Sequence, residues 1–253
     1  GVDPSRCYPD YQTTFEEGAK RPDGAEVVSI ATANGNHYEI TKASLNADMH
    51  VICEKPLFFE IAQVEEIKKL AEQKNKIVGV TYGFSGHPML FQARKMIESG
   101  ELGEVRIVSL RYTHGFSATE DAEKYSEAQK WRVDPQIAGP SFVIGDLSTH
   151  TYYMSQLMLP KLKIKRLLCD RQSFIKSRAP LEDNVHMLMH YDNGAVGTAW
   201  FSAVDAGYME SQTIRIVGQK AGKDLGGSSR ASVAGFLPTP GQSEGHRLRS
   251  DPF

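Results

Sequence analysis

The sequence predicts an α/β protein: part of a doubly wound parallel sheet, followed by an α+β domain with a mostly antiparallel open sheet. Up to about Tyr82, short apolar strands alternate with amphipathic helices, which is typical of parallel strands joined by right-handed crossovers. Beyond that point the strand candidates are longer and alternate between apolar and polar residues. The 253 residues, 40% of them apolar and 24% charged, are enough for two such domains.

The first part contains three strands and two helices in alternation. Turn signals bound the apolar strands predicted at residues 26–32, 50–53 and 76–82. A helix is predicted at about residues 37–47. A second follows Pro56, where helical spacing predicts one apolar face made of Ile61, Val64, Ile67, Leu70 and Ala71.

The second part begins with a helix at about residues 90–98 and a long alternating strand within residues 103–114. After a polar loop, "GDLSTHTYYMSQLM" (residues 145–158) predicts a helix. Further strands are predicted at residues 162–170, 184–192, 193–204 and 211–218. The Asp192-Asn193-Gly194 turn predicts a hairpin between the second and third of these.

These elements suggest domains at residues 1–86 and 87–221. The remainder, residues 222–253, is rich in Gly and Ser without sustained periodicity, and we expect a disordered or aberrant tail there.

Composition excludes several classes of function. A formal net charge of −2 gives no electrostatic footprint for nucleic acid or an anionic membrane. No apolar run is long enough to span a bilayer. Three scattered cysteines argue against a disulfide framework or a metal cluster and favour reduced thiols in the cytoplasm. We therefore expect no metal site.

Lys55 is the first candidate for chemistry. Ligands of open parallel sheets bind beyond the carboxyl ends of the strands. Lys55 follows the strand at residues 50–53 and is held by Pro56, whose preceding peptide bond can be cis in such a turn. A solvated surface charge is the simpler interpretation. A lysine beside a crevice can also stabilise a substrate oxygen that gains negative charge.

Asp146 and His150 form the second candidate. Their spacing in the predicted helix puts them on one face, one turn apart. The imidazole can serve as a general acid and base that the carboxylate orients. A helix N-cap and a structural histidine remain the alternative. Among the other candidates, His37 falls in a crevice loop. Trp131 and Arg132 form either a ligand clamp or an aromatic anchor. His186 and His190 share one strand face.

Taken together, four segments resemble the Gfo/Idh/MocA oxidoreductases, the group of glucose–fructose oxidoreductase and inositol dehydrogenase. They are "EVVSIATANGNHYEITKASLNADMHVICEKPL", "MIESGELGEVRIVSLRYTH", "KWRVDPQIAGP" and "GDLSTHTYY", and the likeness runs from about Tyr8 to Gly218. The resemblance implies a Rossmann domain that binds NAD or NADP and a second domain whose open sheet forms a homo-oligomer interface. It also implies hydride transfer at a sugar or polyol carbon.

The resemblance also implies roles for individual residues. Lys55 matches the lysine that contacts the reacting hydroxyl, His150 the acid/base histidine, and Asp146 its acidic neighbour. The remaining matches lie near the cofactor: Thr32, Asn34, His37, Glu54, Trp131 and Arg132.

The chain departs from the family pattern at both ends. It contains no G-x-G-x-x-G, the loop that brings a pyrophosphate against a helix N-terminus. Asp3 is not the acidic residue of that fingerprint, because no room for a strand-flanking helix is expected before the strand at residues 26–32. We expect that the first two βα units are absent and that the last segment is read out of frame. Within the match, Asp48 replaces a glycine that favours a positive φ.

The leading hypothesis is therefore an NAD(P)-dependent sugar or polyol dehydrogenase. The first alternative is a non-catalytic homologue that has lost cofactor binding and acts as an oligomerisation or interaction module. A lyase that uses Lys55 as a Schiff base is the second alternative, and it requires a desolvated lysine.

Overall fold

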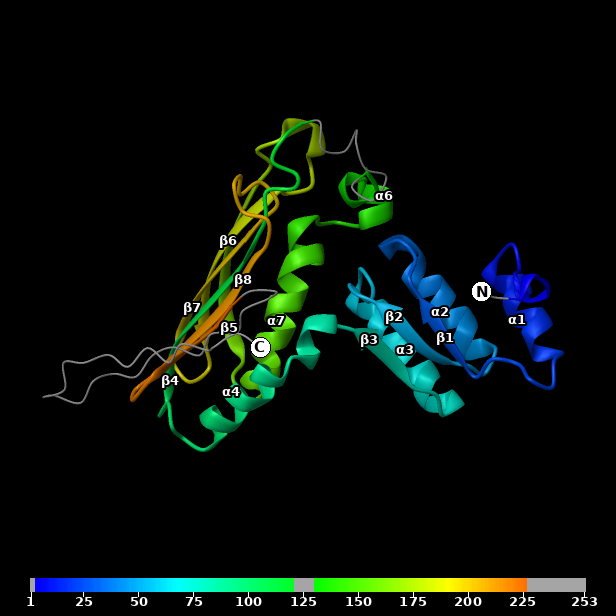
Figure 1. The fold of residues 1–253 in the computed structure, drawn as a ribbon, viewed down its shortest axis with the longest axis horizontal. Coiled ribbons are helices and arrows are strands. Elements are labelled where there is room, and N and C mark those ends of the chain that lie inside the picture. The colour runs from blue at the N-terminus through cyan, green and yellow to red at the C-terminus, as the bar shows by residue number, and fades with distance from the viewer. Residues whose placement is uncertain (1–2, 121–129, 227–253) are drawn as a thin grey trace, which may run out of the picture. The chain divides into compact units, whose positions relative to one another are not determined.

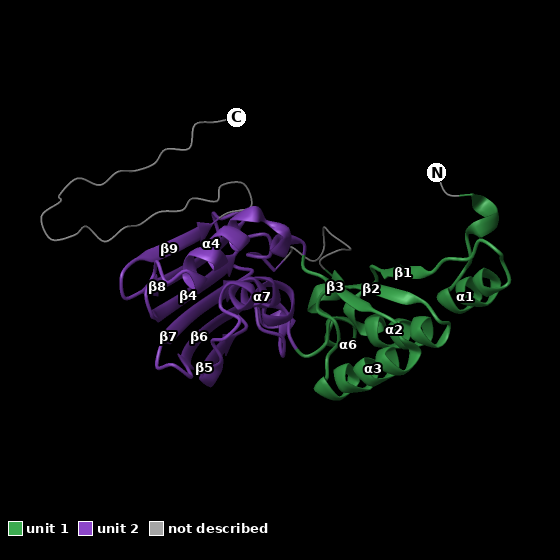
Figure 2. Ribbon diagram, turned by 90° about the horizontal axis from the view of Figure 1, so that it is seen from below, with its two compact units in different colours: residues 1–82, 130–140 green, residues 83–129, 141–253 purple. Residues whose placement is uncertain are grey.

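The computed structural model describes residues 3–120 and 130–226 of the chain. These residues belong to two compact units (Figure 2). Unit 1 comprises residues 1–82 and 130–140, and unit 2 comprises residues 83–129 and 141–253. The units divide at Tyr82 and Gly83, a few residues before the expected boundary at residue 86. Residues 130–140, expected in the second domain, pack with the first unit.

Unit 1 is built on a three-stranded parallel sheet in the order β1-β2-β3 (Figure 1). In chain order its elements are η1 (Pro4–Arg6), α1 (Tyr11–Ala19), β1 (Val27–Ile30), η2 (Asn34–Asn36), α2 (His37–Asn46), β2 (His50–Glu54), α3 (Ile61–Lys74), β3 (Val78–Thr81), η5 (Trp131–Val133) and α6 (Pro135–Ala138). The β-α-β-α-β order predicted from residue 26 onward is confirmed. Helix α1 was not expected, and the conclusion that this region had no room for a helix is wrong.

The core of unit 1 lies between its sheet and helices α2 and α3. It includes Leu45, Val51, Cys53 and Ile67, none more than 3% exposed. The apolar face predicted for α3 is only partly buried, because Ile61 is 81% and Val64 39% exposed. The helical period was therefore right, but the first turn of α3 is more exposed than predicted.

A left-handed residue ends helix α2. Asp48 has a φ of 58°. Its N–H donates to the carbonyl of Leu45, and the N–H of Met49 donates to the carbonyl of Ser44. This is the hydrogen-bond pattern of a Schellman motif, in which glycine is the preferred residue. Asp48 thus adopts the positive φ that was expected at this position, although it is not a glycine.

Unit 2 is built on a six-stranded sheet in the order β5-β6-β7-β4-β8-β9. Its elements are η3 (Gly83–Gly86), α4 (Pro88–Glu98), β4 (Val105–Thr113), a π-helical turn (Ile144–Ser148), α7 (Thr149–Met158), β5 (Ile164–Gln172), η7 (Lys176–Arg178), β6 (Asn184–Tyr191), β7 (Val196–Ser202), β8 (Ser211–Gly218) and β9 (Gly222–Gly226). All neighbouring strands are antiparallel except β4 and β7. This confirms the predicted α+β domain with a mostly antiparallel sheet.

One face of this sheet is covered by α4 and α7 (Figure 1). Val108, Leu110, Met189 and Phe201 point into that layer and are at most 3% exposed. Strands β6 and β7 form the predicted hairpin, and the N–H of Tyr191 donates to the carbonyl of Ala195 across the turn. The alternation of the strands thus separates a buried face from an open one.

Strand β9 corrects the predicted start of the tail. Residues 222–226 pair with β8, and Lys223 and Leu225 lie buried against the sheet. A five-residue strand with glycine at both ends carries little local signal. The predicted tail beyond Gly226 lies outside the described residues.

Candidate active site

In unit 1, the candidate residues lie where β1 and β2 end. Thr32 follows β1, and Glu54 is the last residue of β2. Lys55 comes next and is half-buried, and its peptide bond to Pro56 is cis, as suggested from the sequence. The carboxyl ends of neighbouring parallel strands meet at one edge of a sheet, which brings these two loops together.

His37 joins the two loops. It is 0% exposed, and its Nε2 lies 3.0 Å from the carbonyl oxygen of Thr32 while its Nδ1 lies 2.9 Å from that of Pro56. Both ring nitrogens therefore face a backbone carbonyl oxygen. His37 therefore holds the Lys55–Pro56 turn against the loop after β1.

The segment of residues 130–140 completes this edge of unit 1. The side-chain amide of Asn34 donates to the carbonyl of Ala138 at 3.2 Å. Gly139, with a φ of 89°, lies so close to Phe59 that a Cβ there would be 2.4 Å from its ring. Trp131 and Arg132 are half-buried, and the guanidinium lies 4.6 Å from the centroid of the indole ring. This contact joins two adjacent residues, so both interpretations, a ligand clamp and an aromatic anchor, stay open.

In unit 2, Asp146 and His150 lie on the helical run that begins near Ile144, and both are half-buried. The run differs from the prediction in its first turn. Residues 144–148 form a π turn that contains Asp146, and α7 begins at Thr149. The hydrogen bonds of a π turn join residues five apart, so the simple one-turn spacing of an α-helix does not describe this pair. Single π turns are frequent at functional sites.

Two aromatic rings flank His150, and the sequence did not identify either. The centroid of the Phe84 ring is 4.9 Å from that of the imidazole, and the centroid of Tyr112 is 6.4 Å away. Burial raises the pKa of the Tyr112 hydroxyl, and the negative charges of Glu210 and Asp146 raise it further. Tyr112 therefore remains a neutral phenol beside the Asp146–His150 pair. The available signals were the "TYGF" segment after the third strand and the inward position of Tyr112 in alternating β4.

Glu182 was also missed. It is 1% exposed, and its carboxylate accepts hydrogen bonds from the hydroxyl of Ser141 and from the backbone N–H of Ile144. Both donors lie at the start of the helical run that carries Asp146 and His150. Within the described residues, no group of three or more His, Cys, Asp or Glu side chains is arranged to hold a metal ion.

Two family models match the chain along most of its length. Residues 4–82 match the model described as "Oxidoreductase family, NAD-binding Rossmann fold", and residues 94–241 match "Oxidoreductase family, C-terminal alpha/beta domain". This is the two-domain class that the parallel and antiparallel sheets define. The chain belongs to the Gfo/Idh/MocA oxidoreductase family.

Individual relatives agree with this assignment. The chain is 71% identical over 221 residues to "Uncharacterized oxidoreductase YfiI" of Bacillus subtilis, a match that covers 87% of this chain and 56% of that protein. It is 51% identical to an inositol dehydrogenase homolog from Azotobacter vinelandii complexed with NAD+, with a TM-score of 0.88 over 93% of this chain and 63% of that one. The complex of the Azotobacter homolog with NADH and myo-inositol gives 49% identity and a TM-score of 0.84, with 93% and 62% covered. The chain spans about half the length of the curated relatives it matches.

No helix in the described part of the chain has the length and apolar character that crossing a membrane requires.

Proposed function

We propose that this protein is an NAD(P)-dependent oxidoreductase that transfers a hydride between the nicotinamide and a hydroxyl-bearing carbon of a sugar or an inositol-like polyol. The main support is the 51% identity, over 93% of the chain, to the homolog that was crystallised with NAD+. The complex of that homolog with NADH and myo-inositol supports the polyol class of substrate.

The residues proposed to contact the nicotinamide part of the cofactor all lie in unit 1. Thr32 and Glu54 lie where β1 and β2 end, next to Lys55. His37 is fully buried between two backbone carbonyls, so its proposed contribution is to support the loops. Asn34, Trp131 and Arg132 belong to the adjoining loop and to the segment of residues 130–140. The sequence contains no G-x-G-x-x-G that would bind the pyrophosphate.

In the proposed reaction, a nicotinamide cofactor would supply the hydride acceptor for the substrate carbon, and the residues of this chain would handle the proton. His150 accepts the proton of the hydroxyl on that carbon as general base. Lys55, in unit 1, is proposed to stabilise negative charge that develops on a substrate oxygen. Asp146 favours the protonated imidazole after the transfer by its own negative charge. The neutral Tyr112 and the ring of Phe84 limit the access of water to His150.

A chimera tests the proposal. The regions of the Bacillus subtilis relative that the match leaves uncovered are joined to this chain, and the oxidation of myo-inositol and other polyols is followed by NADH or NADPH absorbance. We expect Lys55→Ala and His150→Ala to lower kcat by about 10²–10⁴-fold, with little change in cofactor affinity. Lys69→Ala, on the exposed surface of α3, is the control. Near-normal turnover in both site variants would contradict the assignment.

The two alternatives have separate tests. The named relatives are oxidoreductases or dehydrogenases and give no support to a non-catalytic homologue. Titration of the chimera with NADH and NADPH, followed by nucleotide fluorescence, detects loss of cofactor binding directly. Borohydride trapping with a keto-sugar detects the Schiff base that the lyase alternative requires.

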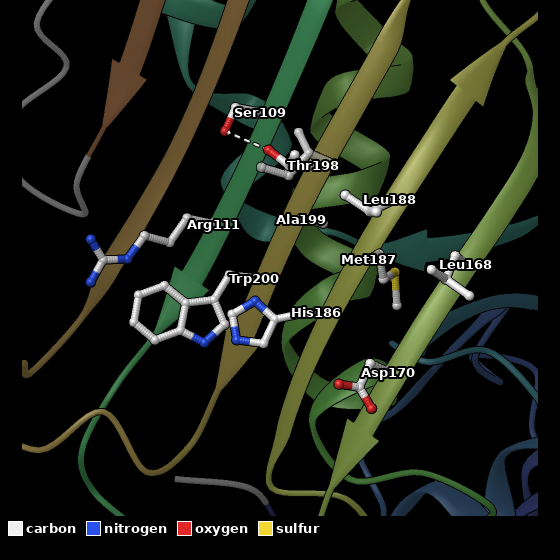
Figure 3. A pocket seen from close by; sticks show the side chains of 11 residues that line it. Ser109, Arg111, Leu168, Asp170, His186, Met187, Leu188, Thr198, Ala199 and Trp200 are labelled. Carbon is white, nitrogen blue, oxygen red and sulfur yellow. Dashed lines mark hydrogen bonds between the residues drawn. The ribbon is translucent and has the colours of Figure 1, made fainter.

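We also propose that the open face of the unit 2 sheet binds a second copy of the chain. Leu168 and Leu188 are 65% and 54% exposed on this face (Figure 3). Beside them, the indole of Trp200 stacks on His186, with 5.6 Å between ring centroids, and lies 4.7 Å from the guanidinium of Arg111. Contiguous apolar and aromatic surface of this kind is typical of protein–protein interfaces.

For location we propose the cytoplasm. Cys7, Cys53 and Cys169 are all free thiols. Proteins of oxidising compartments more often pair their cysteines. Fractionation of cells that express the chimera, with detection by antibody, is the direct measurement.

A further inference from the structure

The carboxylate of Glu182 lies buried at the start of the helical run that carries the Asp146–His150 pair. Its Oε1 accepts hydrogen bonds from Ser141 Oγ at 2.5 Å and from the backbone N–H of Ile144 at 3.1 Å. Its Oε2 accepts a hydrogen bond from Arg171 Nη2 at 2.6 Å. A buried carboxylate is costly unless it is paired and hydrogen-bonded, and here both oxygens are engaged.

These hydrogen bonds provide acceptors for backbone N–H groups at the start of the helical run. The first N–H groups of a helix have no partner within the helix itself. Glu182 accepts that of Ile144, while Ser141 Oγ, which donates to Glu182, accepts that of Gly145 at 3.1 Å. The negative charge of Glu182 is also favourable at the positive end of the helix dipole.

The turn that starts here is the π turn of residues 144–148. Ser148 Oγ donates to the carbonyl of Ile144 at 2.6 Å, and Thr149 Oγ1 donates to that of Gly145 at 3.0 Å. Asp146 lies inside the turn, and His150 lies two residues after Ser148, the last residue of the turn. The start of the turn therefore sets the direction in which both side chains project.

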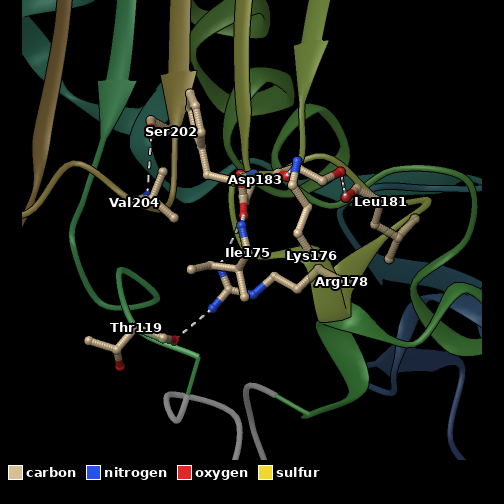
Figure 4. Close-up of polar contacts among 10 residues, drawn as sticks. Thr119, Ile175, Lys176, Arg178, Leu181, Asp183, Ser202 and Val204 are labelled. Carbon is tan, nitrogen blue, oxygen red and sulfur yellow. Dashed lines mark hydrogen bonds and ion pairs between the residues drawn. The ribbon is translucent and has the colours of Figure 1, made fainter.

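The neighbouring carboxylate makes a separate set of contacts. The neighbouring Asp183 is 0% exposed and accepts hydrogen bonds from the N–H groups of Phe174 and Ile175, both at 2.9 Å. It also pairs with buried Arg178, whose Nη2 donates to the carbonyl of Thr119 (Figure 4). Asp183 thus contacts the loop at Phe174 and Ile175, whereas Glu182 contacts the start of the helical run.

We propose that Glu182 is a positioning residue, which fixes the π turn and so aligns Asp146 and His150 for proton transfer. The proposal rests on the function proposed above for this pair. Neither Glu182 nor Arg171 is assigned any contact with substrate or cofactor.

The first test measures backbone protection in the 253-residue chain and needs no activity. Amide hydrogen exchange of residues 144–150 is compared with that of β6 and β7 in Glu182→Gln, Glu182→Ala and Ser141→Ala. We expect exchange in the turn to accelerate by about tenfold in Glu182→Ala, and less in Glu182→Gln, whose amide oxygen still accepts. Ser141→Ala removes one link and leaves Glu182 in place, so it serves if Glu182→Ala does not fold.

Asp183→Asn is the matched control, because it makes the same chemical change one residue away. It is expected to accelerate exchange near Phe174 and Ile175 and to leave residues 144–150 protected. Wild-type protection of the turn in Glu182→Gln and Ser141→Ala would overturn the proposal. So would equal acceleration in Asp183→Asn, which would show a general loss of stability.

The second test connects the turn to catalysis. In the chimera, Glu182→Gln is expected to lower kcat about tenfold or more while KM changes less than about threefold. In Glu182→Gln, the midpoint of the NMR titration of the His150 imidazole is also expected to shift. Asp183→Asn is expected to leave this midpoint unchanged. An unaltered titration and kcat in Glu182→Gln would contradict the positioning role. A wild-type chimera that transfers no hydride instead contradicts the proposed function, and the exchange data then still decide whether Glu182 holds the turn.

Discussion

Cys53 is expected to make the free energy of unfolding fall at alkaline pH. Burial raises the pKa of its thiol to about 11, and the negative charge of Glu54 contributes. Between the ordinary pKa and this value, the unfolded state loses the proton and the native state keeps it. The free energy of unfolding therefore holds its full value below about pH 9 and falls as the pH rises towards 11.

The expected fall between pH 7.5 and 9.5 is about 1 kcal/mol from this group. Urea unfolding in the presence of reductant measures it, and Cys53→Ala is expected to remove most of that slope despite lower stability at neutral pH. Cys7→Ala, at an exposed thiol, is the control and keeps the wild-type slope. Equal slopes in the two variants would contradict the prediction. Burial also raises the pKa of Tyr191, to about 12, and that of Tyr112, so tyrosine ionisation adds to the fall from about pH 10 upward.

At the level of single residues, the sequence pattern predicted the position of Lys55 in the turn after β2, but it did not predict the burial of Glu182. Lys55 was located at the tip of β2 because strand, lysine and proline follow one another directly. Glu182 carries no such signal, because its burial depends on Arg171 and on the backbone at Ile144, which approach only in the folded chain. His37 was placed in the correct loop, but its contact with the carbonyl of Pro56 depends on the way the loops after β1 and β2 fold together.

At the scale of elements, Gly139 controls how the segment of residues 130–140 packs in unit 1. A Cβ at this position would lie 2.4 Å from the ring of Phe59, and its φ of 89° also disfavours other residues. We expect Gly139→Ala to detach the segment, which would be seen as faster amide exchange at residues 131–138 and altered Trp131 fluorescence.

A second glycine separates the clash from the backbone strain. Gly194 has a φ of 88°, and a Cβ there would meet nothing within 4 Å. Gly194→Ala is therefore expected to cost about 1 kcal/mol from the conformation alone, while Gly139→Ala is expected to cost clearly more. Equal losses of stability, with residues 131–138 still protected, would show that the contact with Phe59 does not hold the segment.

Element types followed from periodicity, whereas deviations from regular elements did not. The alternation of β6 and β7 and their Asn-Gly turn fixed a hairpin, because the signal is contained in adjacent residues. The π turn at residues 144–148 depends on hydroxyl groups and on a carboxylate from another part of the chain, so the sequence indicated only a helix. Strand β9 is short and forms by pairing with β8, which a local pattern cannot reveal.

At the scale of the molecule, the order of strands and helices predicted both sheets, but not which segments share a unit. Short apolar strands that alternate with helices predicted the parallel sheet of unit 1. Longer strands that alternate between apolar and polar residues predicted the mostly antiparallel sheet of unit 2. The return of residues 130–140 to unit 1 depends on contacts such as that between Asn34 and Ala138, which are far apart in the sequence.

The oligomer proposal makes a prediction that one substitution tests. Leu188 is 54% exposed on the open face and lies opposite Leu168 on β5 and Thr198 on β7. Leu188→Glu puts a charge at this position, where burial against a second copy would strip its water. We expect self-association to weaken at least tenfold, or about 1.4 kcal/mol, as measured by light scattering on a concentration series.

Thermal unfolding separates this effect from misfolding. Because Leu188 points away from α4 and α7, the melting temperature extrapolated to low concentration is expected to remain near the wild-type value. Ile61→Glu, at a residue 81% exposed on α3, makes the same change outside the open face and is expected to keep the wild-type mass. A wild-type chain that is monomeric throughout the series would count against the proposal, as would a Leu188→Glu variant with unchanged mass. If only Leu188→Glu dissociates, the self-association depends on the open face of the unit 2 sheet.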